Sequence, residues 1–165
     1  MSKAPIRKPA REPGFDYRQP GPYFITICEY RRLPRFGSVL DGKMHANAAG
    51  DMILATWQDL PDHFSFASLD NSVLMPNHFH ALLTLESVDI ETNASLSDVI
   101  QWFKSVTTTR YGAGVRRLGW PTYSGHLWQG SYHDRIVRTE AEFDRYWRYI
   151  DANPALWADD VFHTQ

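Results

Sequence analysis

Two apolar runs joined by a proline–asparagine pair restrict the possible folds of this chain more than any other feature of its sequence. The runs span roughly residues 65–75 and 78–85, and Pro76-Asn77 lies between them. Proline presets φ for one turn position and asparagine tolerates the next, so the pair predicts a tight connection between antiparallel strands. A central hairpin of this kind favours an antiparallel sheet.

Helical patterns lie on both sides of the predicted hairpin. Residues 47–61 carry apolar side chains at helical spacing and predict a helix that stops near its last residue, a proline. Two later amphipathic helices are predicted to begin at capping motifs, which are Ser95-x-x-Asp98 and Thr139-x-x-Glu142. The second of them is expected to run to about residue 153.

The remaining segments complete a single mixed domain. Residues 23–30 and 132–137 predict two further strands, whereas the three glycines of 112–119 predict a flexible, arginine-bearing loop. We therefore expect an α+β fold over residues 23–154: a ferredoxin-like (RRM-like) antiparallel sheet with helices packed against it.

The charge is unevenly distributed, although the formal net charge is only −2. Residues 100–138 hold six lysines and arginines against one acidic residue. Such a stripe can bind a phosphate backbone even where the net charge predicts no such binding. A solvated basic surface without a ligand is the alternative. The candidates for backbone contact are Lys104, Arg110, Arg116 and Arg117.

The two ends of the chain and its single cysteine suggest where the protein works. Residues 1–22 are proline-rich and charged, which predicts a flexible basic arm, and residues 155–165 are expected to form a C-terminal tail. Cys28 has no partner for an internal disulfide, so a reducing compartment fits. No apolar run has the length of a membrane span. We expect a cytoplasmic protein without a membrane partner, associated with the nucleoid when it binds DNA.

His78 and His80 lie two residues apart on the second strand of the predicted hairpin. Because side chains alternate along a strand, both histidines share one face with Leu82 and Thr84. The other face is uniformly apolar and is expected to point into the core. Two imidazoles placed in this way can converge on one metal ion. Two hydrogen-bonded or surface histidines would show the same pattern.

The last predicted helix places Tyr149 and Asn153 one turn apart on the flank of its apolar face. Measured from Phe143, Tyr149 falls about 120° and Asn153 about 80° to the same side. A residue on this flank can reach the sheet and stay accessible to a substrate. Alternatively, Tyr149 only packs and Asn153 only ends the helix. Tyr132 and Tyr146 are competing nucleophiles.

From residue 23 to residue 154 the sequence resembles the REP-associated tyrosine transposases, a branch of the HUH single-strand DNA transposases and nucleases. VLMPNHFHALLTL (73–85) resembles their histidine hairpin, and LSDVIQWFKSVTTTRY (96–111) resembles the helix that follows it. Residues 127–154 resemble their C-terminal block, which ends in a Tyr-Ile-x-x-Asn-Pro pattern. The three blocks occur in the order that the family shows.

The resemblance implies a role for each candidate residue. His78 and His80 match the metal-binding histidines, Tyr149 matches the catalytic tyrosine, and Asn153 matches the position of a third, polar metal ligand. An amide oxygen suits a hard cation, so Mg²⁺ or Mn²⁺ is the implied cofactor. The implied partner is single-stranded or hairpin DNA of the REP type, cut through a covalent 5′-phosphotyrosine and then rejoined. No P-loop motif occurs, so no nucleotide cofactor is expected, and the protein could act as a monomer or a homodimer.

Two other functions fit the same residues. A non-catalytic nucleic-acid-binding domain would bind DNA without a metal ion and without Tyr149. A metal-dependent phosphodiesterase that uses water would keep both histidines as ligands but would form no covalent intermediate.

Overall fold

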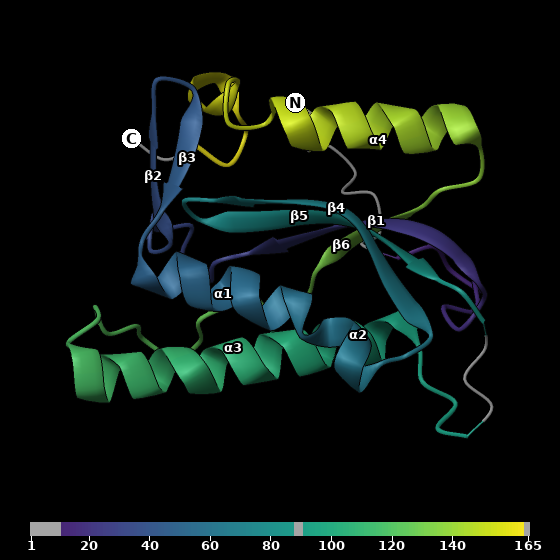
Figure 1. Ribbon diagram of the computed structural model, residues 1–165, viewed down its shortest axis with the longest axis horizontal. Helices are drawn as coiled ribbons and strands as arrows, with labels where there is room; N and C mark the ends of the chain where they lie inside the picture. The colour runs from purple at the N-terminus through teal and green to yellow at the C-terminus, as the bar shows by residue number, and fades with distance from the viewer. Residues whose placement is uncertain (1–10, 88–90, 164–165) are drawn as a thin grey trace, which may run out of the picture.

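The centre of the molecule is a four-stranded antiparallel sheet, seen in a computed structural model that describes residues 11–87 and 91–163 (Figure 1). Across the sheet the strands follow the order β4 (Ala67–Met75), β5 (His78–Leu85), β1 (Gly21–Cys28) and β6 (His133–Ile136). The predicted hairpin is the β4–β5 pair, in which Met75 lies opposite His78. This antiparallel order, with β1 and β5 in the centre, confirms the expected ferredoxin-like α+β fold.

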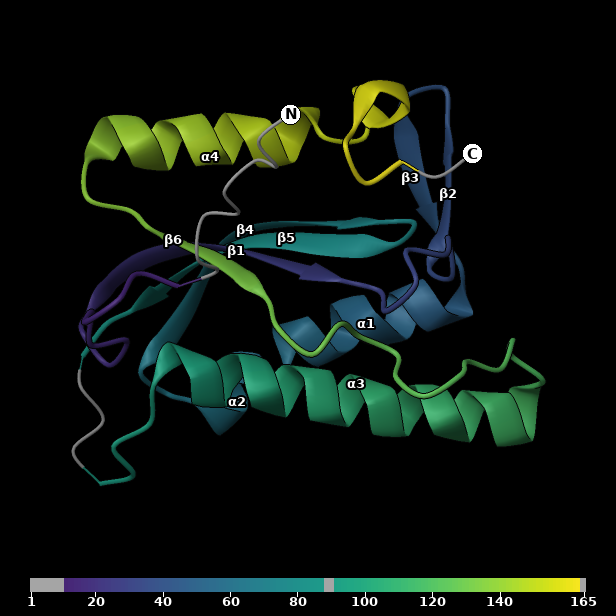
Figure 2. The same cartoon turned by 180° about the vertical axis from the view of Figure 1, so that it is seen from behind.

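Helices cover both faces of the sheet (Figures 1 and 2). One face carries α1 (Ala48–Gln58), α2 (Leu60–His63) and α3 (Leu96–Leu118), and the other carries α4 (Glu140–Ala152). A short 3₁₀ helix, η1 (Trp157–Asp159), follows α4. The sheet is therefore the middle of three layers.

A small hairpin, β2 (Gly37–Leu40) and β3 (Lys43–Ala46), is inserted before α1. Its turn is Asp41-Gly42, with φ of 50° and 70° at the two residues. Positive φ at both positions is what a tight two-residue hairpin turn needs, and Asp-Gly is a strong signal for it. This hairpin was not predicted.

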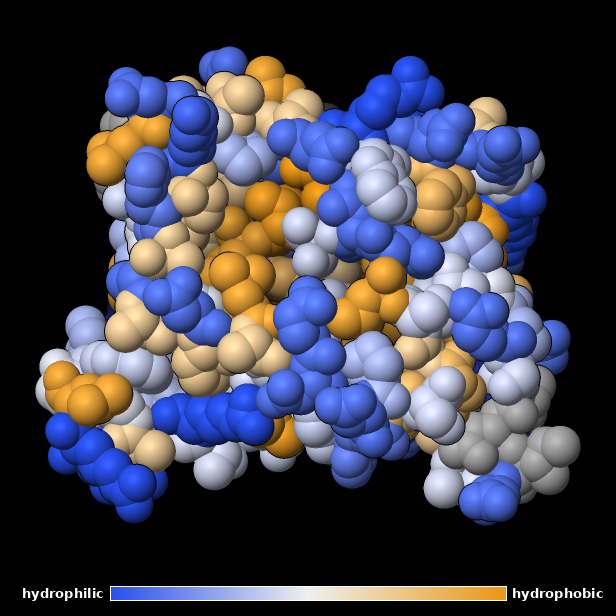
Figure 3. All heavy atoms as spheres, in the orientation of Figure 1, coloured by the Kyte–Doolittle hydropathy of each residue, from blue (hydrophilic) through white to orange (hydrophobic). Residues whose placement is uncertain are grey.

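The apolar side of β5 points into the main core, as its alternation predicts. Phe79 packs against Trp57 of α1 and Phe103 of α3, with ring centroids 5.0 and 5.5 Å apart. A smaller apolar cluster on the opposite face joins Phe24 and Leu82 to Ile150 of α4. In Figure 3 the apolar surface on the visible side gathers between the helix layers, while their outer sides are mainly hydrophilic.

The predicted caps begin both later helices. Ser95 Oγ accepts the amide N–H of Asp98, while the Asp98 carboxylate accepts the amide N–H of Ser95. Thr139 Oγ1 accepts the amide N–H of Glu142. The expected helix 47–61 is divided into α1 and α2, because Pro61 begins the second helix instead of ending the first. The expected strand 23–30 is shifted to 21–28.

The expected loop 112–119 is wrong, because α3 continues to Leu118 and ends at Gly119 in the left-handed conformation, with φ of 69°. Gly114 is buried in this helix, and a Cβ at this position would overlap the indole ring of Trp120. The glycine therefore allows the chain after the helix to fold back onto it. This close packing overrides the low helix propensity of glycine.

Replacing Gly114 with alanine is expected to lower the free energy of unfolding by about 1–3 kcal/mol, because the new methyl group displaces Trp120. Gly112 offers a matched control in the same helix, since its Cβ would meet only the flexible end of Arg116, 3.4 Å away. Gly112→Ala should raise the free energy of unfolding by roughly 0.5–1 kcal/mol. Urea denaturation of both variants measures the difference. Equal effects would contradict this role of Gly114.

Both ends of the described chain pack on the domain. Of the expected arm 1–22, residues 1–10 lie outside the described residues, whereas Tyr17 is 9% exposed and its carbonyl accepts the amide N–H of Leu96. Of the expected tail 155–165, residues 164–165 lie outside the described residues, whereas residues 155–163 fold back over the α4 side of the sheet, where Phe162 contacts the ring of His78. Among the described helices, none combines the length and apolar character needed to cross a membrane.

Candidate active site

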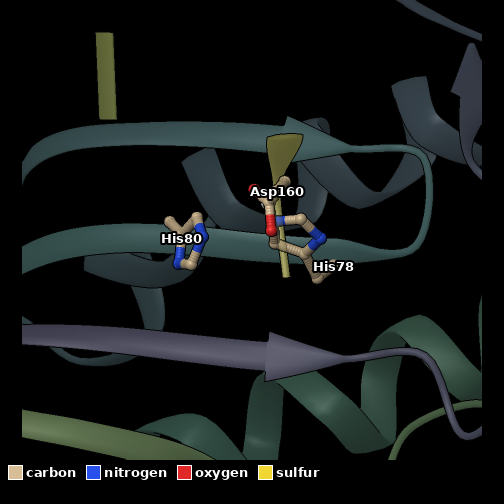
Figure 4. A group of neighbouring side chains, drawn as sticks. All are labelled: His78, His80 and Asp160. Atoms are coloured by element: carbon tan, nitrogen blue, oxygen red, sulfur yellow. Dashed lines mark ion pairs between the residues drawn. The ribbon is translucent and has the colours of Figure 1, made fainter. Parts of the chain in front are cut away.

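His78 and His80 lie close together on β5 (Figure 4). They face the α4 layer, since the His80 ring contacts Tyr149 of α4. Their ring centroids are 4.6 Å apart, and their exposed fractions are 0% and 1%. The expected face is confirmed, since Leu82 of the same strand contributes to the apolar cluster with Ile150. The burial of the histidines has a tertiary origin, because Phe162 and Trp157 pack against the ring of His78.

Hydrogen bonds at Nδ1 orient both imidazoles. His80 Nδ1 lies 2.7 Å from Thr26 Oγ1, and His78 Nδ1 lies 2.8 Å from Asn77 Oδ1. The Asn77 amide nitrogen donates to the carbonyls of Arg32 and Phe162, so its oxygen must be the acceptor. His78 in its neutral form therefore carries its proton on Nδ1 and keeps the lone pair of Nε2 free. This is the arrangement of a metal-ligating histidine held by an outer partner.

Three buried polar atoms gather here without a hydrogen-bond partner. Within residues 11–87 and 91–163, four buried side-chain atoms lack one: His78 Nε2, His80 Nε2, Asn153 Oδ1 and Asp134 Oδ1. All but the last belong to this site. Because buried polar atoms without partners are rare, a group of lone pairs in one place fits the binding of a cation. The donor set of two imidazoles and an amide oxygen thus suits a divalent metal ion.

Asp160 adds a carboxylate that the sequence analysis did not identify. Its Oδ2 lies 3.8 Å from His78 Nε2, and the ligand atoms of Asp160, His78 and His80 all lie within 4.8 Å of one another (Figure 4). Asp160 Oδ1 accepts the amide N–H of Phe162, which leaves Oδ2 directed at the histidine. Nothing in the sequence pattern distinguishes this aspartate from its neighbour Asp159, because only the folding back of the segment brings it to the site.

The helix α4 brings Tyr149 and Asn153 to the same place. The Tyr149 ring lies 5.2 Å from the His80 ring and is 40% exposed, whereas Asn153 is 2% exposed. Asn153 keeps helical angles (φ −55°, ψ −45°) although proline follows it, so the two side chains remain one turn apart. Asn153 influences both neighbours, since it favours the protonated form of His78 and the ionised form of Tyr149.

Burial governs the ionisation of these groups. It lowers the pKa of His78 to about 3 and, together with the nearby His78, holds the pKa of His80 well below 6.5. Burial also raises the pKa of the Tyr149 phenol, and the negative charge of Asp160 raises it further. The histidines are therefore neutral and ready to bind a cation at neutral pH, while Tyr149 is protonated.

Acid is expected to destabilise the metal-free protein below pH 6.5. The unfolded chain protonates its histidines near pH 6.5, whereas folded His78 stays neutral down to a pKa of about 3. The unfolded state thus binds more protons in this window, and stability falls as the pH falls. Between pH 6.5 and 4.5 the loss is about 2 kcal/mol for His78 alone. Urea denaturation in EDTA measures it.

The control for this acid effect is the double variant His78→Gln and His80→Gln. It separates the effect of the histidines from that of Asp70 and Asp134. Burial raises the pKa of both aspartates, so their protonation stabilises the folded protein as the pH falls. A double variant that lost stability as steeply as the unmodified chain would contradict the assignment.

The two competing tyrosines have other surroundings. Tyr146 stacks on Phe24 with ring centroids 4.4 Å apart, as its position nearer the apolar face predicts. Tyr132 is 6% exposed, and its hydroxyl lies 3.2 Å from Ser97 Oγ, at the start of α3. Trp147 lies near Phe143 on the apolar face of α4 by helical period, yet it is 38% exposed because the cluster under this helix is small.

The four cations proposed for DNA contact all lie on α3, across the sheet from Tyr149 (Figure 1). Lys104 Nζ donates to the carbonyls of Gln129 and Gly130, at 2.6 and 3.1 Å, and so holds that loop. Arg110 pairs with Asp59 at 3.2 Å. Arg116 and Arg117 are exposed in the last turn of the helix. The fold therefore does not bring this group together with the histidines.

Comparisons with known proteins give this geometry a family. Residues 42–153 match the model of the family described as Transposase IS200 like. An uncharacterised protein of Haemophilus influenzae is 30% identical over 167 residues, which cover 95% of this chain and 93% of the relative.

Two solved structures share the fold. A candidate transposase from Deinococcus radiodurans is 18% identical, with a TM-score of 0.54 over 86% of this chain and 95% of the other. A REP-associated tyrosine transposase bound to a REP hairpin is 16% identical, with a TM-score of 0.56 over 87% and 72% of the two chains. Since the family model covers more than half of the sequence, including both histidines and Tyr149, the chain belongs to the IS200-like transposases.

Proposed function

We propose that this transposase cuts and rejoins single-stranded DNA with Tyr149 as its nucleophile. The observation that carries the proposal is the half-exposed Tyr149 phenol beside three buried lone pairs, those of His78 Nε2, His80 Nε2 and Asn153 Oδ1. A nucleophile next to a set of metal-donor atoms is what metal-assisted phosphodiester cleavage requires.

The ligand set for a divalent ion would consist of His78 and His80, with Asn153 or Asp160 as the third donor. When bound, Mg²⁺ or Mn²⁺ would neutralise charge on the scissile phosphate and orient it for in-line attack. Both ions accept imidazole, amide and carboxylate donors while leaving positions for phosphate oxygens.

The covalent step follows from the chemistry of the phenol. The Tyr149 oxygen loses its proton and bonds to phosphorus, and the bond to the 3′ oxygen breaks, which leaves a 5′-phosphotyrosine and a free 3′-hydroxyl. Attack by another 3′-hydroxyl reverses the step and joins DNA without a nucleotide cofactor. Burial and the negative charge of Asp160 both raise the pKa of Tyr149. A positive charge that neutralised Asp160 would therefore favour the reactive phenolate.

The proposed substrate is a REP-type hairpin with a single-stranded flank. Its support is the shared fold with the transposase that was solved with a REP hairpin. Tyr149 and both histidines come from one chain, so the proposed chemistry requires no residue of a second copy, and either a monomer or a homodimer would suffice.

The test is to incubate the protein with a 5′-labelled or 3′-labelled hairpin oligonucleotide and Mn²⁺. A protein–DNA adduct that survives denaturation is expected, and EDTA should abolish it. Metal-dependent cleavage without an adduct would favour hydrolysis by water. Binding without cleavage would favour a non-catalytic DNA-binding domain. Either of these results would overturn the proposal.

A further inference from the structure

A groove between β6 and α4 adjoins the candidate active site, since two of its residues, Thr26 and Phe162, contact the histidines. Its inner pocket has a volume of about 280 Å³ and is lined by Phe24, Thr26, His133, Asp134, Arg135, Tyr146 and Phe162. A second pocket adjoins it, and the two share Asp134, Arg135 and Tyr146. The lining of the second pocket includes two further arginines and two carboxylates: Arg138, Arg145, Glu12 and Glu142. We call the two pockets together the β6–α4 groove. Figure 2 shows β6 at the edge of the sheet, running up towards α4.

The register of the edge strand places His133 and Arg135 on this side of the sheet. His133 lies opposite Thr26, and Arg135 lies opposite Phe24. Directly opposite residues of an antiparallel pair project to the same face, so both side chains share the face of the two candidate metal ligands. At the inner end of the groove, Thr26 hydrogen-bonds His80.

The arginines of this groove differ in their ion pairing. Arg138 pairs with Glu12 at 2.8 Å. In the part of the chain that the structure describes, no ion pair is found for Arg135 or Arg145: Arg135 donates to the Asp134 carbonyl and Arg145 to the Tyr146 hydroxyl. Both are exposed. Their charge is therefore available to an anion, unlike that of Arg110 on α3, which has Asp59 beside it.

Stacked rings connect these exposed arginines to the buried histidine. The Arg145 guanidinium lies 5.0 Å above the Tyr146 ring, Tyr146 stacks on Phe24, and Phe24 stacks on His80 with centroids 5.4 Å apart. The rings of Phe24 and Tyr146 are covered within this stack, so its outer end offers the exposed Arg145 guanidinium to a base or a phosphate. A guanidinium plane beside cations is typical of single-strand binding, because every base has a π-face and every phosphodiester link of the DNA carries a negative charge.

We propose that the β6–α4 groove holds the single-stranded DNA segment next to the phosphate that is cut, with Arg135 and Arg145 binding its phosphates. This inference rests on the proposed function and specifies where the flank of the hairpin lies. It also moves the DNA contact from the α3 cations to the face that carries Tyr149. A pocket of about 280 Å³ lies at the small end of the range for ligand sites, which suits a single nucleotide better than a duplex.

The test uses binding alone and is made in Tyr149→Phe protein, so that cleavage does not interfere. Fluorescence anisotropy with Mn²⁺ compares three hairpins: one with a 5′ flank, one with a 3′ flank and one blunt. The double variant Arg135→Gln and Arg145→Gln should bind one of the flanked hairpins at least about 10-fold more weakly. The slope of log K against log salt concentration should become shallower by roughly 1.4, about 0.7 for each lost phosphate contact. Binding of the blunt hairpin should change little.

Arg148→Gln is the matched control, because Arg148 is an exposed arginine of α4 that does not line the groove. Its flank binding should remain unchanged. The groove assignment is overturned if the double variant keeps full affinity, if it weakens blunt and flanked hairpins equally, or if Arg148→Gln weakens binding as much. If the unmodified protein forms the adduct but the double variant keeps its affinity for flanked hairpins, only the groove is rejected. If the double variant selectively loses flank binding but the unmodified protein never forms the adduct, only the catalytic proposal is rejected.

Discussion

The Tyr149→Phe protein should form no denaturation-resistant adduct with hairpin DNA, and its strand cleavage should fall by at least about 10³-fold. Phenylalanine keeps the ring beside His80 and Phe24 but removes the oxygen that is proposed to bond to phosphorus. Because the Tyr149 side chain is 40% exposed, the free energy of unfolding should change by less than about 1 kcal/mol. Denaturing gels with labelled DNA measure the adduct.

Tyr146→Phe is the matched control for this prediction. Tyr146 lies on the same helix, and its ring also contacts Phe24. The Tyr146 ring stacks on Phe24 face to face, whereas the Tyr149 ring meets Phe24 edge-on. This variant should keep most of the adduct. If Tyr149→Phe still forms the adduct, or if Tyr146→Phe alone abolishes it, the nucleophile has been assigned to the wrong residue.

Replacing either histidine with alanine should weaken Mn²⁺ binding by at least about 100-fold. Loss of an outer hydrogen-bond partner already lowers metal affinity by about 10–100-fold in known sites, so loss of a direct ligand should exceed that range. Both rings are buried, and both present an unpartnered Nε2 to the same space. Electron paramagnetic resonance of free Mn²⁺ gives the affinities, and circular dichroism verifies that each variant is folded. Unchanged affinity in both variants would reject the site.

The third ligand can be identified by comparing Asn153→Ala with Asp160→Asn. Asp160→Asn removes the charge but keeps an oxygen, whereas Asn153→Ala removes its donor entirely. The variant with the larger loss of Mn²⁺ affinity marks the stronger contribution. Asp160→Asn should also lower the pKa of Tyr149, because the carboxylate raises it now. A higher pKa of the Tyr149 phenol in this variant would contradict the placement of the Asp160 charge beside it.

Much of the fold could be predicted because its signals are local. Pro76-Asn77 forms the β4–β5 turn, and the caps Ser95 and Thr139 begin α3 and α4. Alternation along β5 also assigned its two faces correctly. The small hairpin could have been found from Asp41-Gly42, which carries positive φ at both residues.

The glycines of α3 show where local signals fail. Gly112 and Gly114 indicate a loop by propensity, yet both lie inside the helix. The indole ring of Trp120, which comes from beyond the helix end, occupies the space over Gly114. Close packing that forms only in the folded chain therefore decided this segment.

The candidate site divides in the same way. Spacing alone placed His78 beside His80 and Tyr149 one turn from Asn153, since the periods of strands and helices are fixed by backbone geometry. It could not place α4 over that face of the sheet, bring Asp160 within 3.8 Å of His78, or put the α3 cations on the opposite face. These contacts join segments far apart in the sequence, and they exist because each layer buries its apolar side against the sheet.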